Sequence, residues 1–205
     1  MFGKKRSGAK KPGPPVHDDL CAVVEETGRT RHAFIADDSN RLWIGDITEH
    51  WTNEGKLYLC AFKDVHSNRI VGYSIDSRMK SQLAVTALNN AVARRGDVAG
   101  CVSTPTEGRN SGAGNSCRPW AVTTWSDRWA ESARAATTPP WRAIFSLLQK
   151  NVLNRRTWAT REDLRIAIVT WIERTYHRRR RQDRLGRLTP VELETIMTTP
   201  AVQAA

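Results

Sequence analysis

Cysteine is the residue type in this sequence best suited to bind a metal ion or form a disulfide, and its spacing argues against both. The four cysteines are Cys21, Cys60, Cys101 and Cys117, and no two of them form a Cys-x-x-Cys pair. None of them has a histidine nearby at the spacing of a zinc finger. We therefore expect no zinc site and interpret the cysteines as free thiols of a reducing cytoplasm.

Basic residues are the second group that could carry function, since the formal net charge is +11 and the pI is about 10.1. The excess lies in GKKRSGAKK near the start and in HRRRRQDR near the end. Lysine and arginine neutralise phosphates, so this charge favours a polyanionic partner, most simply DNA or RNA. A solvated basic surface is the alternative. Arg178, Arg179, Arg180 and Arg181 are accordingly either contacts to a DNA backbone or an exposed charged tail.

Residues 1–38 are interpreted as a basic N-terminal arm or linker, because they combine lysines with KPGPP. No apolar run reaches the roughly 18 to 20 residues that a membrane span requires. No apolar segment follows the first lysines as it would in a secretory signal. These features predict a cytoplasmic protein.

Residues 39–100 have the pattern of a layered α/β domain. RLWIGDITEH is followed by GKLYLCAFKDVHSNRIVGYSIDS, in which DVHSN favours a turn between two strand-like runs. Three strands connected so closely predict an antiparallel meander with Asp46 on the first strand. SQLAVTALNNAVARRG predicts a helix that is capped by its serine and ends at Gly96.

Residues 143–199 are predicted to be helical. AIFSLLQKNVL and TREDLRIAIVTWIERTYH are amphipathic, and Thr160 with Asp163 resembles a capping arrangement. Lys150, on the first of these helices, is either a DNA-phosphate contact or a solvated side chain. In LGRLTP, Gly186 is expected to end a turn and Pro190 to begin a final helix. Strands followed by helices indicate an α/β or α+β layer fold.

The sequence resembles a known family at both ends. LWIGDITEHWTNEGKLYLCAFKDVHSNRIVGYSID is similar to the opening of the integrase-type (DDE) catalytic core of bacterial insertion-sequence transposases, and WIERTYHRRRRQDRLGRLTPVELE resembles its closing segment. The resemblance implies a ribonuclease-H-like integrase core, a DNA partner and a bacterial, nucleoid-associated location. It also implies phosphoryl transfer with two Mg²⁺ or Mn²⁺ ions held by two aspartates and a glutamate. Asp46 matches the first aspartate and hence a catalytic metal ligand.

The other two carboxylates of that pattern are missing. The family carries them in HSDRG after the first helix and in MES before a further helix, and neither motif is present. Instead, residues 101–142 form an aberrant segment that includes VSTPTEGRNSGAGNSC, which has no hydrophobic period. Asp127 or Glu131 would be substitutes only if a different active-site segment had evolved here, and no spacing supports either. His50 and His66 lie near the expected metal end, but lone histidines beside strands are more often surface or turn residues.

A shifted reading frame explains the aberrant segment. Permissible codons for Ser103 to Arg142, read from each third base, are compatible with HSDRGSQFRGRK and with CGDNAAMES. The hidden aspartate codon straddles Pro105 and Thr106, and the hidden glutamate codon straddles Trp141 and Arg142. Thirty-five codons lie between them, which is the spacing of the family.

These observations predict a transposase core for DNA integration and recombination that is catalytically defective. The alternative is a non-catalytic basic DNA-binding fragment that inhibits intact transposase by co-assembly. The family's upstream helix-turn-helix region is not recognisable here. We expect the strands and helices outside residues 102–142 to keep the ribonuclease-H-like geometry. The fourth strand and the helix leading to the catalytic glutamate should be absent or badly formed within that range.

Overall fold

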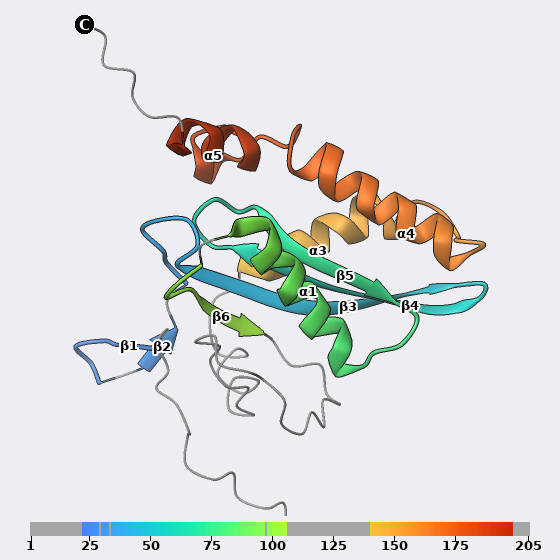
Figure 1. The fold of residues 1–205 in the computed structure, drawn as a ribbon, viewed down its shortest axis with the longest axis horizontal. Helices are drawn as coiled ribbons and strands as arrows, with labels where there is room; N and C mark the ends of the chain where they lie inside the picture. Colours follow the sequence, from blue (N-terminus) through green and yellow to red (C-terminus); the bar gives the residue numbers. More distant parts are fainter. Residues whose placement is uncertain (1–21, 29, 33, 97, 106–139, 199–205) are drawn as a thin grey trace, which may run out of the picture.

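A four-stranded sheet forms the centre of the fold (Figure 1). The computed structural model describes residues 22–28, 30–32, 34–96, 98–105 and 140–198. The strands are β3 Leu42–Thr52, β4 Gly55–Asp64, β5 Ile70–Asp76 and β6 Val102–Pro105, in the order β5-β4-β3-β6. The first three pair antiparallel, whereas β6 runs parallel to β3. A separate small hairpin consists of β1 Ala22–Val24 and β2 Thr30–His32.

Strand β4 shows why the sheet is buried on both faces. Leu57, Leu59 and Ala61 belong to one hydrophobic cluster, whereas the alternate residues Cys60 and Phe62 belong to another. Successive side chains of a strand point to opposite faces, so a continuous apolar run fills two core layers at once.

Helix α1, Ser81–Arg95, covers one face and lies against β5. The helix backbone approaches the strand at Gly72, where an added Cβ would lie 2.4 Å from the carbonyl oxygen of Ala87. Glycine is therefore required at this contact for steric reasons. Arg94 and Arg95 occupy the last turn, and the chain then continues toward β6.

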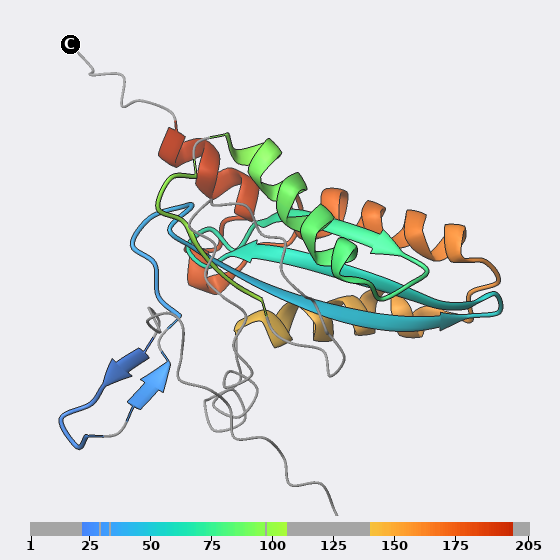
Figure 2. The ribbon, with the colours of Figure 1, turned by 60° about the horizontal axis from the view of Figure 1, so that its bottom comes forward.

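The later helices cover the opposite face, as Figure 2 shows for α1 and α3. They comprise α3 Pro140–Asn151, a 3-10 turn η1 Leu153–Arg155, α4 Arg161–Thr170 and a π turn η2 Trp171–Tyr176 that continues α4. Their apolar side chains share a cluster with β4 and β5. A 3-10 turn η3, Asp183–Leu185, and α5, Pro190–Thr198, complete the described chain.

The ribonuclease-H-like fold expected from the sequence is confirmed in its antiparallel three-strand meander and in the helices that pack on it. The capping interaction is also confirmed, because the Thr160 hydroxyl accepts a hydrogen bond from the Asp163 backbone N–H at 3.0 Å. Pro190 begins α5, and Gly186 ends a turn with a φ of 63°. The cap of α1 was predicted wrongly, since Lys80 occupies that position and makes no side-chain cap bond.

The expected loss of the fourth strand is wrong for residues 102–105. Val102 pairs with Leu42 and Pro105 with Gly45, in register beside the strand of Asp46. The prediction required apolar side chains, but a four-residue strand can form through backbone pairing, and Val and Thr favour extended backbone. Proline at the last position of an edge strand removes little pairing. Residues 140–142, at the end of the aberrant segment, begin α3, and residues 106–139 lie outside the described residues.

Candidate active site and its surroundings

Asp46 lies in the middle of the sheet, on β3, where it pairs with Ala61 of β4. It is half-buried, and its Oδ1 accepts a hydrogen bond from the Ile47 backbone N–H at 2.8 Å. The preceding Gly45 allows close packing, since a Cβ there would lie 2.5 Å from the Phe62 ring. Gly45 also pairs with Pro105, so the end of β6 lies beside the residue before Asp46.

No cluster of three or more metal-binding side chains forms around Asp46 within the described part of the chain. No group of three or more His, Cys, Asp or Glu side chains there could hold a metal ion. The described residues alone therefore do not supply a site for two divalent ions, because each ion needs several oxygen ligands. Asp127 and Glu131, the candidate substitutes, lie outside the described residues.

Two nearby groups that are able to bind metals have other roles. The buried Asp64 carboxylate accepts backbone N–H bonds from Asn40, His66 and Ser67, and so holds the β4–β5 turn together. Burial raises the pKa of the Cys60 thiol to about 12, and the charge of Asp46 adds to the effect. Cys60 is therefore a neutral core residue at physiological pH.

The two histidines lie apart from any candidate metal cluster in the described residues. His50 is on β3, near the hairpin end, and burial lowers its pKa. His66 lies in the predicted turn between β4 and β5, with its backbone N–H bound to Asp64.

The predicted DNA contacts come from two other elements. Lys150 is exposed in the last turn of α3. Arg178, Arg179, Arg180 and Arg181 follow the π turn and are exposed. Arg181 is partly engaged, since it pairs with Glu192 at 3.2 Å and donates to the Arg187 carbonyl. Arg178, Arg179 and Arg180 therefore have exposed side chains without a carboxylate partner among the described residues.

The Tyr–His pair of the closing motif has a structural role that its sequence does not reveal. The Tyr176 hydroxyl donates to the Asn68 carbonyl at 2.8 Å, and the Ile70 backbone N–H donates to Nε2 of His177 at 3.1 Å. Nδ1 of His177 faces Glu173 at 3.2 Å. Because Nε2 is an acceptor here, the proton of neutral His177 lies on Nδ1. Both side chains attach the π turn to the β4–β5 turn.

A buried carboxylate that the sequence analysis missed attaches α5 to the sheet. Glu194, on α5, receives hydrogen bonds from Ser67, Arg69 and Arg95. Burial raises the pKa of Glu194, but these hydrogen bonds outweigh burial and the net shift is downward. Partners so distant along the chain leave no periodic signal in the sequence.

Residues 36–107 match the family described as Integrase core domain. The chain is 27% identical over 182 residues to the transposase for insertion sequence element IS629 of Shigella sonnei, covering 84% of this chain and 57% of that protein. It is 30% identical over 192 residues to transposase InsF for insertion sequence IS3A of Escherichia coli strain K12, covering 92% of this chain and 66% of that protein. The chain thus spans less than two thirds of these relatives.

Among solved structures, the chain is similar to the HTLV-2 integrase catalytic core domain in complex with magnesium. For the trimeric form the TM-score is 0.46 with 16% identity, covering 75% of this chain and 95% of that one. No helix in the described part of the chain is long and apolar enough to cross a membrane.

Proposed function

Because this chain belongs to the family of insertion-sequence transposases with an integrase core, we propose that it descends from a DNA strand-transfer enzyme and is itself catalytically defective. The observation that carries the proposal is Asp46, which stands at the family's first aspartate position on β3, although no group of three or more His, Cys, Asp or Glu side chains in the described residues could hold a metal ion. We further propose DNA and other transposase copies as partners, and the bacterial cytoplasm, in association with the nucleoid, as the location.

The family resemblance implies Mg²⁺ or Mn²⁺, which would activate the attacking oxygen and stabilise the leaving one. Asp46 alone would leave such ions weakly bound and mostly hydrated. The described residues supply a rigid strand for Asp46, but no group of three or more metal-binding side chains. Without positioned ions, the negative charge that develops in the transition state is not stabilised, and strand transfer should not proceed.

A translated frameshift between about Gly100 and Ala143 is the proposed origin of the defect. The hidden aspartate codon straddles Pro105 and Thr106, and Pro105 lies beside Gly45, next to Asp46. The hidden glutamate codon straddles positions 141 and 142, in the first turn of α3, and α3 packs on β3. A restored frame would therefore place both carboxylates on elements adjacent to the strand of Asp46, which supports the proposal.

The deciding experiment compares the present chain with one whose hidden frame is restored from residue 103 to 142. We expect metal-dependent nicking or strand joining on element-end DNA only after restoration, and its loss again with Asp46→Asn. Sequencing the coding DNA supplies an independent readout, since the hidden frame must be there. Activity of the unrestored chain that disappears with Asp46→Asn would refute the proposed defect.

A second candidate function is a non-catalytic DNA-binding product that interferes with intact transposase. The exposed arginines 178–180 favour it, because they have no carboxylate partner among the described residues. Mixing the chain with an active relative of the same element should then lower transposition. A variant with these arginines replaced by serine should interfere less.

A further inference from the structure

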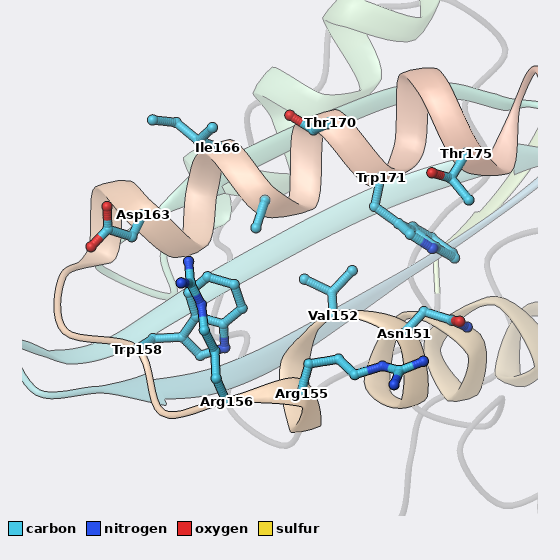
Figure 3. Close-up of a pocket in the computed structure, with 11 residues that line it drawn as sticks. Asn151, Val152, Arg155, Arg156, Trp158, Asp163, Ile166, Thr170, Trp171 and Thr175 are labelled. Atoms are coloured by element: carbon cyan, nitrogen blue, oxygen red, sulfur yellow. The ribbon is translucent and has the colours of Figure 1, made fainter.

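A groove lies on the outer side of the helical layer, away from the sheet (Figure 3). It has a volume of about 420 Å³, within the range of small ligand sites. Its floor is apolar and includes the buried Val152, Trp158 and Trp171, and Ile166 of α4 contributes an apolar wall that is 56% exposed. We call this hollow between the end of α3, η1 and α4 the α3–α4 groove.

Two arginines border this groove. Arg155 and Arg156 line it with exposed side chains, and neither pairs with a carboxylate within the described ranges. The Arg156 guanidinium lies over the Trp158 ring, 4.4 Å from its centroid, which fixes its position without neutralising it. Figure 3 shows both side chains starting from the α3–η1 side: Arg155 lies toward Asn151, whereas the Arg156 guanidinium extends toward the end of the groove that holds Asp163. The groove therefore combines an apolar floor with a net positive border.

We propose that the α3–α4 groove binds a protein segment that presents an aromatic or aliphatic side chain next to two or more carboxylates. The apolar side chain would occupy the floor between Trp158, Trp171 and Ile166. The carboxylates would accept hydrogen bonds from Arg155 and Arg156, whose planar guanidinium groups suit paired oxygens. This inference is independent of the proposed catalytic defect, because it uses neither Asp46 nor the 106–139 segment.

The apolar floor of the α3–α4 groove favours an acidic peptide over a DNA backbone as its ligand. A phosphate backbone needs a row of cations and makes little use of an apolar hollow. This groove offers only two arginines, over a floor that includes two tryptophans. A peptide can place its apolar residue on the floor and one carboxylate beside Arg155, which lies toward Asn151 and away from Asp163 (Figure 3). The surface chemistry thus favours a protein partner.

The test measures binding of the fluorescein-labelled peptide GSDELFEDGS to the full chain by fluorescence anisotropy. We expect binding that weakens by at least about tenfold when Arg155→Glu and Arg156→Glu are combined, since charge-assisted hydrogen bonds are lost. The matched control combines Arg78→Glu and Lys80→Glu, which makes the same charge change in the exposed loop between β5 and α1, outside the groove lining. The control should lose much less affinity. The peptide GSDEGGEDGS should bind at least about threefold more weakly, because it lacks the apolar pair.

A second variant tests the floor without changing charge. Ile166→Ser should weaken binding by about threefold or more, whereas Ile196→Ser, at an isoleucine of α5 that is 61% exposed, should not. Absence of peptide binding, or equal loss in the Arg78/Lys80 control, overturns the proposal. The proposal also fails if duplex DNA displaces the peptide and loses as much affinity as the peptide does in the Arg155/Arg156 variant. That result would assign the groove to DNA.

Discussion

Replacing Glu194 by glutamine tests whether the buried ion network holds α5 on the core. The Glu194 side chain is 9% exposed and Arg95 is 12% exposed, whereas Arg69 is 39% exposed. Removing one partner of a buried pair costs about 3–5 kcal/mol, because the remaining charge is left unpaired. Because Arg69 can turn to solvent, only the Arg95 charge is left buried without a partner. The lower end of that range therefore applies. We expect a loss of about 3 kcal/mol in unfolding free energy.

Thermal and urea unfolding followed by circular dichroism measure this effect. A loss of about 3 kcal/mol corresponds to a drop in Tm of roughly 6–12 °C for a chain of this size. The control is Glu192→Gln, on the same helix. Its pair with Arg181 has side chains that are 39% and 63% exposed, so a much smaller loss than for Glu194→Gln is expected. Glutamine at either position retains a hydrogen-bond acceptor, so each substitution measures the effect of removing the negative charge.

The pH dependence supplies an independent check with a definite sign. Because the folded pKa of Glu194 lies below its ordinary value of 4.5, its contribution is complete above pH 4.5 and is lost as the pH falls through the lowered value. The unfolding free energy of the Glu194→Gln variant should therefore change less with pH below 4.5 than that of the parent protein. Adding Arg95→Met should restore part of the stability, since the stranded charge is removed. If Glu194→Gln unfolds at the parent's Tm, or Arg95→Met restores nothing, the reasoning is refuted.

Three further predictions concern other contacts. His177→Phe removes the acceptor of the Ile70 N–H, so the unfolding free energy measured in urea should fall by about 1–3 kcal/mol. An unchanged urea midpoint would contradict the role of Nε2. Gly72→Ala places a methyl group 2.4 Å from the Ala87 carbonyl oxygen, so the unfolding free energy in urea should fall by about 1–3 kcal/mol. An unchanged unfolding free energy would show that α1 can move away from β5. Replacing Arg178, Arg179 and Arg180 by serine should reduce the slope of log K against log salt for duplex DNA by about 2.7, equally for unrelated sequences. An unchanged slope would show that these side chains do not contact phosphate.

The local elements could be predicted because their signals are local. The alternating and continuous apolar runs around Asp46 fix the meander, and Thr160 fixes the start of α4 through a bond three residues away. Strand β6 was missed because its four residues form by backbone pairing, which apolar patterning does not report. Glu194 was missed for another reason. Its partners Arg69 and Arg95 lie 125 and 99 residues away, and a charged residue at either end looks like an ordinary surface residue.

The π turn at Trp171–Tyr176 makes the register of everything after it dependent on a single residue. A π turn accommodates one extra residue in an α-helix, as the bond from the His177 N–H to the Ile172 carbonyl shows. Deleting one residue here would convert the segment to a regular helix and rotate all that follows by about 100°. His177 and the four arginines after it would then leave their present orientation together. This segment should therefore tolerate substitutions on its exposed side but reject changes in length, even by a single codon.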